Sequence, residues 1–243
     1  MKHILALASF ALFVMAFACS AGTGGRAINI EIALSGTDEP SFVNALGWSV
    51  ELSEASVTLG PVYVFAPANA PTAALLPLFG SGIGPNRAFA HGGLDPLDGR
   101  AVRGELLEQI LVDALDPTPI VRAAPGEEGP VDEVAVELLP TATGASARVS
   151  GVAIRDGETV EFSGELTLNE EEFRRVEGIA LQAFLLEGSR VSVRVDPRSW
   201  LSGVAFDRLD GQPLEGASQP QAAFRIGLRS ARSFSAEHSN DTE

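Results

Sequence analysis

The residue types best suited to metal chemistry lie close together in the stretch HGGLDPLDGR. His91, Asp95 and Asp98 stand within eight residues of one another, and Glu105 follows shortly afterwards. A neutral imidazole and carboxylate oxygens are ligands for divalent cations, and the neighbouring glycines allow the backbone to turn tightly around one point. The spacing matches no named metal loop. The stretch therefore predicts a divalent-cation site that uses His91, Asp95 and Asp98, with Glu105 as a further ligand.

A simpler explanation accounts for the same residues without a metal. Both aspartates begin common turn dipeptides, Asp-Pro and Asp-Gly, which occur wherever a chain reverses direction. Arg100 or Arg103 follows closely enough to pair with one of the two carboxylates. An ordinary pair of turns is therefore the alternative to a cation site.

Other catalytic chemistries have few of the residues that they need. The sequence has one cysteine and three histidines, and it contains no GxSxG, HExxH, P-loop or dinucleotide motif. A single cysteine excludes an intramolecular disulfide and a thiolate zinc site. Acidic residues are so numerous that runs such as Glu127-Glu128 and Glu170 to Glu172 are expected to be solvated faces. We predict a protein that is not an enzyme, with a carboxylate-dependent hydrolase as an alternative.

The single cysteine, Cys19, stands directly after an apolar run. Residues 4–17 are all apolar or small and follow a single lysine. A membrane-spanning helix needs roughly 20 apolar residues, so this run is too short for one but fits a secretory signal peptide. Ala16 and Ala18 provide the small side chains that a signal peptidase accepts. We therefore expect a signal peptide over residues 1–18, with cleavage before Cys19.

This arrangement resembles the lipobox of bacterial lipoproteins, in which the cysteine thiol takes up a diacylglycerol group. The resemblance implies lipid attachment at Cys19 and anchoring of the protein to a membrane. Because Ser20 rather than Asp follows the cysteine, it also implies transport to the outer membrane. Ordinary secretion predicts the same cleavage and is the alternative. In either case residues 19–26 are expected to form a flexible tether.

The charge of the chain limits its partners. The formal net charge is −15, and removal of residues 1–18 takes away Lys2, which leaves −16 and arginine as the only fully basic side chain. Such a surface repels phosphate backbones and anionic headgroups. We therefore expect no nucleic-acid partner.

Hydrophobic residues recur with a period of two in several short stretches, which is typical of half-buried strands. The clearest are AINIEIAL, LGWSVEL, VDEVAVELL and RVSVRV. The phase slips at Glu54, which predicts either a bulge in one strand or two separate strands. Asp156-Gly157, between two alternating runs, predicts a hairpin. A second hairpin is expected around residues 187–189.

Helix signals are fewer. Asn169 is a candidate cap for a short helix through EEEFRRV, and Ser218 is a candidate cap for a helix in SQPQAAFRIGLRS. Residues 105–115 fit either a helix or a buried strand. Trp48 is expected on the buried face of a strand, and Trp200 is expected to fill the core at one end of the sandwich.

These patterns predict a mostly β protein, specifically an antiparallel β-sandwich with one or two short peripheral helices. A single domain is expected over residues 27–236, followed by a disordered tail over 237–243.

The connection over residues 66–103 is long for a loop in a compact domain, and loops of this length are usually functional or disordered. It is rich in glycine and proline yet carries several large apolar residues. We therefore expect it to pack on the sheet or to contact a partner. The sequence as a whole predicts an exported, lipid-anchored envelope protein with a non-enzymatic binding or scaffolding role, which contacts an envelope protein through this loop. A divalent-metal-handling lipoprotein that uses the same loop is the first alternative, and the hydrolase is the second.

Overall fold

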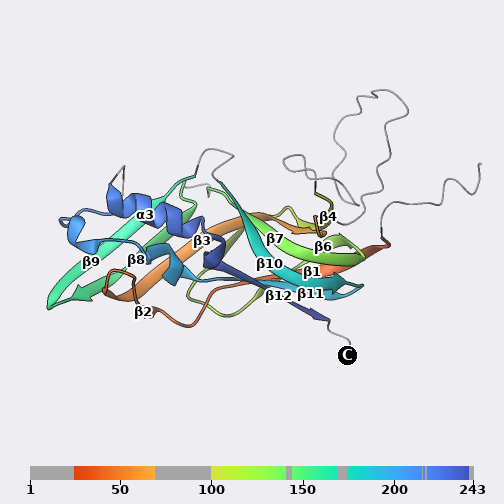
Figure 1. Cartoon of the computed structure of the whole chain (residues 1–243), viewed down its shortest axis with the longest axis horizontal. Coiled ribbons are helices and arrows are strands. Elements are labelled where there is room, and N and C mark those ends of the chain that lie inside the picture. Colours follow the sequence, from red (N-terminus) through yellow and green to blue (C-terminus); the bar gives the residue numbers. More distant parts are fainter. Residues whose placement is uncertain are drawn as a thin grey trace, which may run out of the picture.

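The computed structural model describes residues 25–68, 100–140, 144–168, 174–214, 216 and 218–240, most of which lie in strands (Figure 1). The strands are β1 (Ala27–Ser35), β2 (Ser41–Val43), β3 (Ser49–Phe65), β4 (Val102–Leu106), β5 (Ile110–Asp113), β6 (Ile120–Glu127), β7 (Gly129–Leu138), β8 (Ala147–Arg155), β9 (Glu158–Leu166), β10 (Arg175–Leu185), β11 (Ser189–Val195) and β12 (Phe234–Asn240). The helical segments are the α-helix α3 (Gln219–Leu228) and the 3₁₀ turns η1 (Pro197–Leu201), η2 (Phe206–Arg208) and η3 (Ala231–Ser233). The protein is mostly β, with a peripheral helix, as the sequence predicts.

The strands form one mixed sheet. Its main path runs β10-β7-β3-β4-β6-β1-β11-β12, while β2, β5 and β8 also pair with β3, and β9 pairs with β8. Among the described strands, β1 and β11 form the only parallel pair within a sheet that is otherwise antiparallel. The two terminal strands of the path, β10 and β12, also pack against each other. The mostly β fold is as predicted, but the strands pair into one mixed sheet rather than a purely antiparallel one.

The longest strand, β3, joins the two halves of this sheet. Its first half pairs with β2 and β8, and its second half pairs with β4 and β7. Opposite β8, the register shifts between Leu52 and Glu54, so the phase slip in the sequence corresponds to a bulge in one strand. The ambiguous residues 105–115 contain the end of β4 and the whole of β5, and they form no helix.

The hairpin predicted at Asp156-Gly157 joins β8 to β9. Both turn residues have positive φ, 53° at Asp156 and 84° at Gly157, and Arg155 pairs with Glu158 across the turn. Positive φ at both central residues is the geometry of the tight turn that suits the twist of a hairpin. The prediction is confirmed.

Replacement of this glycine gives the first testable prediction. Gly157→Ala should lower the free energy of unfolding by about 1–2 kcal/mol, because a β-carbon is unfavourable at this backbone conformation. Chemical denaturation of the two proteins measures the difference. Glu161→Ala, at an exposed position of β9, is the matched control and should leave stability unchanged.

The second predicted hairpin, around residues 187–189, is wrong in its pairing. The chain does turn there, but β10 pairs with β7, whereas β11 pairs with β1 and β12. The turn is bound to β1 because Asn29 donates to Glu187 from its backbone nitrogen (3.1 Å) and from its side chain (3.0 Å). These hydrogen bonds lower the pKa of Glu187. They connect the turn to β1, the strand with which β11 pairs in parallel.

The predicted disordered tail is also wrong for residues 237–240, which belong to β12. This strand pairs with β11 along its whole length, from Phe234 opposite Val195 to Asn240 opposite Ser189. The hydroxyl of Ser189 donates to Asn240 Oδ1 (2.8 Å) and lies 3.2 Å from His238 Nε2. The segment is polar because β12 is the last strand on the path of the sheet and most of its side chains are exposed to solvent. Residues 241–243 lie outside the described part of the chain.

The helix predicted to follow Asn169 is wrong at its C-terminal end, where the residues belong to a strand. Residues 169–173 lie outside the described part of the chain, whereas Arg175 and Val176 belong to β10 and pair with β7. Pairing along the sheet, with Val176 buried against the core, outweighs the local helix signal in these residues.

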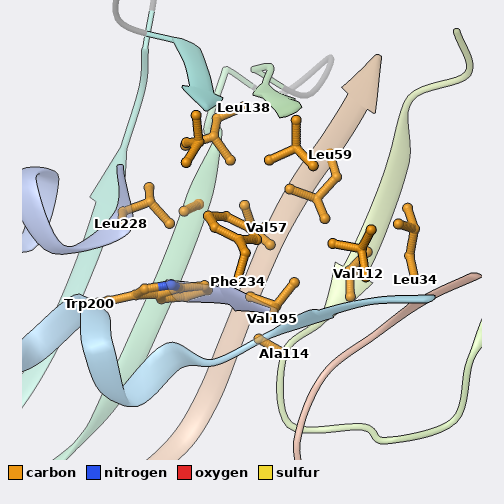
Figure 2. Packing of buried hydrophobic residues seen from close by; sticks show 14 of the residues in the cluster. Leu34, Val57, Leu59, Val112, Ala114, Leu138, Val195, Trp200, Leu228 and Phe234 are labelled. Atoms are coloured by element: carbon orange, nitrogen blue, oxygen red, sulfur yellow. The ribbon is translucent and has the colours of Figure 1, made fainter. Parts of the chain in front are cut away.

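Both tryptophans lie in the core, as predicted, and each anchors a different segment. Trp48 contacts the ring of Phe206 in η2, with ring centroids 5.7 Å apart. Trp200, in η1, lies 6.3 Å from the ring of Phe224 in α3. Figure 2 shows Trp200 in the same buried cluster as Leu228 of α3. Trp200 therefore holds α3 against η1, and the outer side of this junction is hollowed.

Candidate functional site

A groove of about 630 Å³ lies between β2, η1 and α3. Strand β2 contributes Phe42 and Val43, the residues after η1 contribute Ser202 and Gly203, and α3 contributes Ile226 and Gly227 among the lining residues. Its volume falls in the range of about 300–1,000 Å³ that is usual for ligand sites.

Local sequence signals fix the position of α3 beside the groove. The hydroxyl of Ser218 accepts a hydrogen bond from the backbone nitrogen of Gln221 (3.3 Å), so the predicted cap is confirmed. Phe224 and Leu228 are buried against η1 and the sheet. Gly227 permits the closest approach, because a β-carbon there would lie 2.4 Å from the carbonyl oxygen of Trp200.

Asn44 holds the opposite wall in place. Its side-chain nitrogen donates to the carbonyl oxygens of Leu201 (3.3 Å) and Val204 (2.9 Å). Its side-chain oxygen accepts from the backbone nitrogens of Leu46 (2.9 Å) and Trp48 (3.1 Å). This buried amide therefore uses all of its principal donors and acceptors to join the end of β2 to η1.

The groove exposes two large apolar side chains at its rim. Val43 is 68% exposed and Ile226 is 72% exposed, the highest values among the large hydrophobic residues that the structure describes. A single exposed apolar residue needs no explanation, but two that converge on one concavity indicate a contact surface.

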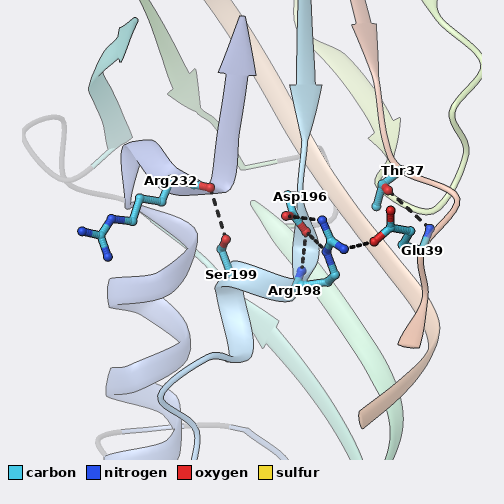
Figure 3. Close-up of polar contacts among 6 residues, drawn as sticks. All are labelled: Thr37, Glu39, Asp196, Arg198, Ser199 and Arg232. Atoms are coloured by element: carbon cyan, nitrogen blue, oxygen red, sulfur yellow. Dashed lines mark hydrogen bonds and ion pairs between the residues drawn. The ribbon is translucent and has the colours of Figure 1, made fainter. Parts of the chain in front are cut away.

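Arg198, which lines the groove, is hydrogen-bonded to two carboxylates (Figure 3). Its guanidinium donates to Asp196 through Nε (2.8 Å) and Nη2 (2.9 Å), and through Nη1 to Glu39. Burial raises the pKa of Asp196, and the hydrogen bond from the backbone nitrogen of Arg198 opposes that rise. Arg198 is thus fixed by two carboxylates, so it offers no free positive charge to a ligand in the groove.

Arg232 is the second basic residue of the groove, and it is differently placed. Its carbonyl oxygen accepts from the hydroxyl of Ser199 (3.2 Å), which lies between the two arginines in Figure 3. Its side chain is exposed and has no carboxylate within ion-pair distance among the described residues. Residues 218–236 as a whole contain three arginines and no acidic residue, in a chain of net charge −15. Arg232 therefore gives the groove one exposed positive charge.

The residues predicted to bind metal or lipid are not part of this groove. Cys19, His91, Asp95 and Asp98 lie outside the described residues, as does most of the 66–103 connection. Glu105 lies on β4 and is buried. Among the residues that the structure describes, no cluster of three or more His, Cys, Asp or Glu side chains is arranged to hold a metal ion. The cation site therefore stays a prediction.

The pairing of Arg100 or Arg103 with Asp95 or Asp98 stays a prediction, because both aspartates lie outside the described residues; among the described residues, each arginine has a glutamate partner. Arg100 Nη1 lies 2.6 Å from Glu133 Oε2, and Arg103 Nη1 lies 3.1 Å from Glu127 Oε1. The prediction that Glu127 is solvated is therefore wrong: it faces inward at the end of β6, where Arg103 of β4 meets it. A glutamate pair in the sequence does not show which of its members turns inward.

A second cavity, of about 450 Å³, is lined by the carboxylates of Glu54, Asp113 and Asp116. It is therefore the candidate location for the predicted hydrolase site. Two of these carboxylates support turns: Asp113 accepts from the backbone nitrogen of Leu115 (2.9 Å), and Asp116 from that of Thr118 (2.8 Å). Hydrogen bonds from Thr118 lower the pKa of Asp116, which disfavours it as a proton donor. We propose no hydrolytic role for this cavity.

The fold and the groove together define a mostly β protein with a candidate binding surface beside a peripheral helix. Sequence reasoning missed Val43, Ile226 and Arg232, although the absence of acidic residues over 218–236 was a usable signal. Comparisons of the chain with protein-family models, with curated proteins and with solved structures find no match. Within the described residues, no helix combines the length and apolar character needed to cross a bilayer.

Proposed function

We propose that this chain is an exported bacterial envelope protein, anchored to the outer membrane by a lipid on Cys19, with a non-enzymatic role in binding another envelope protein. The groove between β2 and α3 is its contact surface. The observation that carries the binding role is that Val43 and Ile226, two exposed apolar side chains, line one concavity together with the exposed Arg232. The 66–103 connection, largely outside the described residues, stays a prediction as a second contact surface.

The anchor rests on the sequence around Cys19. A run of 14 apolar or small residues, small side chains at the cleavage site and the lone thiol in the first mature position form one consistent signal. A diacylated cysteine, followed by the short polar and glycine-rich stretch up to β1, would leave the sheet free to reach a partner.

Membrane fractionation tests the anchor. The wild-type protein should sediment with membranes and require detergent for release, whereas Cys19→Ala should be found in the soluble fraction, because a thiol is needed to carry the lipid. Intact mass spectrometry of the membrane form should show the added acyl chains. Ser20→Ala, which keeps the thiol, is the matched control and should remain in membranes. A wild-type protein that is soluble and has an unmodified thiol would rule out anchoring.

A further inference from the structure

We propose that the partner presents to the groove an extended acidic peptide segment, with an apolar side chain seated between Val43 and Ile226 and a carboxylate directed at Arg232. This inference rests on the proposed binding function and specifies the chemistry of its partner. Three features of the groove support it: the exposure of its two apolar side chains, the edge of β2 that pairs with no described strand and the charge of Arg232.

The apolar walls favour a chain over a compact ligand. Val43 and Ile226 lie at the rim, so a small molecule on the groove floor would leave much of both side chains in water. An extended peptide that runs along the rim can cover both of them. Burial of apolar surface stabilises a complex by about 25 cal/mol per Å², so that cover is a substantial part of the affinity available here.

The edge of β2 offers hydrogen bonds to an extended chain. Asn44 donates from its backbone nitrogen to the carbonyl oxygen of Trp48 (2.9 Å), which places the N–H and C=O of Phe42 on the side of β3. Ser41 and Val43 therefore direct their backbone groups to the opposite side, where the described residues supply no strand. Addition of a strand to such an edge is a common mode of peptide recognition.

The charge distribution selects an acidic chain. Of the two arginines that line the groove, Arg198 is held by Asp196 and Glu39, whereas Arg232 is exposed, and the chain as a whole is strongly acidic. An acidic peptide is therefore attracted at this surface and repelled elsewhere, which favours one binding position. A basic peptide would be drawn to the rest of the surface instead. A bilayer is a less suitable partner, because the two exposed apolar residues line a concave surface, whereas insertion into a membrane requires apolar residues that protrude.

A labelled peptide tests this proposal. The probe is a fluorescent hexapeptide that alternates glutamate with valine or leucine, and its control replaces each glutamate by lysine. Fluorescence anisotropy with the purified protein should show saturable binding of the acidic probe and at least about tenfold weaker binding of the basic one. Binding should also weaken as salt is added, because Arg232 is exposed to solvent.

Two variants locate the binding. Ile226→Ser and Arg232→Glu should each weaken binding of the acidic probe by about tenfold. Their matched controls make the same changes outside the groove: Leu111→Ser, at a position 60% exposed on β5, and Arg26→Glu, before β1. Both controls should bind like the wild type, and circular dichroism should show that all four variants are folded.

The outcomes separate this inference from the proposed function. Absence of acidic-probe binding at protein concentrations up to about 1 mM, equal binding of the two probes, or equal effects of groove and control variants would overturn the inference. Vesicles of phosphatidylglycerol that sediment the protein through Ile226, without peptide binding, would overturn it in favour of a membrane surface. Failure of the Cys19→Ala fractionation test, with peptide binding intact, would remove the anchor and leave the groove assignment standing.

Discussion

Gly227→Ala should lower the free energy of unfolding by about 2–3 kcal/mol and abolish binding to the groove. In an ordinary helix this change would be favourable by about 1 kcal/mol, because alanine is the better helix former. Here the new β-carbon would lie 2.4 Å from the carbonyl oxygen of Trp200 and 2.7 Å from that of Ser199. Both are backbone atoms, so α3 and η1 would have to separate, and the groove between them would change shape.

Gly203→Ala is the matched control, because it adds the same methyl group to the same groove. Its β-carbon would meet only the side chain of Ala223, at 3.9 Å, an ordinary van der Waals distance. The free energy of unfolding of this variant, measured by denaturation, should equal that of the wild type to within about 0.5 kcal/mol. If Gly227→Ala were as stable as Gly203→Ala, the close approach of α3 to η1 would be wrong.

Arg103→Met should be the most destabilising of the single changes considered, at about 3–5 kcal/mol. Arg103 and Glu127 form an ion pair in which only 16% and 7% of the side-chain surfaces are exposed. Removal of the guanidinium leaves a buried carboxylate without its counter-charge, and that desolvated charge accounts for most of the cost. The pair also joins β4 to β6, two strands whose backbone pairing is described at one position only.

Two further variants separate this explanation from a general loss of arginine. Arg122→Met removes an exposed pair with Glu108, whose side chains are 42% and 52% exposed, and should change stability by no more than about 0.5 kcal/mol. The double variant Arg103→Met, Glu127→Leu should recover most of the lost stability, because no unpaired charge remains. Urea denaturation monitored by tryptophan fluorescence measures all three. A double variant as unstable as Arg103→Met would show that packing, rather than charge, is what Arg103 provides.

Local patterns in the sequence predicted the strands well and their partners poorly. The alternation in AINIEIAL and RVSVRV identified β1 and β11, and Asp156-Gly157 identified the β8–β9 hairpin, because each signal depends on neighbouring residues. The parallel pairing of β1 with β11 depends on contacts about 160 residues apart, such as Glu31 with Arg190. No short window of sequence contains that information.

The candidate site escaped prediction for a related reason. Its walls come from β2 on one side and from η1 and α3 on the other, and β2 lies far from both in the chain, so the walls meet only in the folded protein. Ile226 lies in the segment predicted to be a helix, and of its apolar residues Phe224 and Leu228 are buried whereas Ile226 is exposed. Which apolar residue faces outward depends on the rotation of α3 against η1, and the contact at Gly227 sets that rotation.

The pairing of β11 with both β1 and β12 has a consequence for export. These neighbours bring together residues from opposite ends of the polypeptide, so this part of the sheet cannot form until residues 234–240 are available. Pairings of such long sequence separation are slow to form. In the export that we propose, this part of the sheet would form only after β12 had emerged on the far side of the translocation channel.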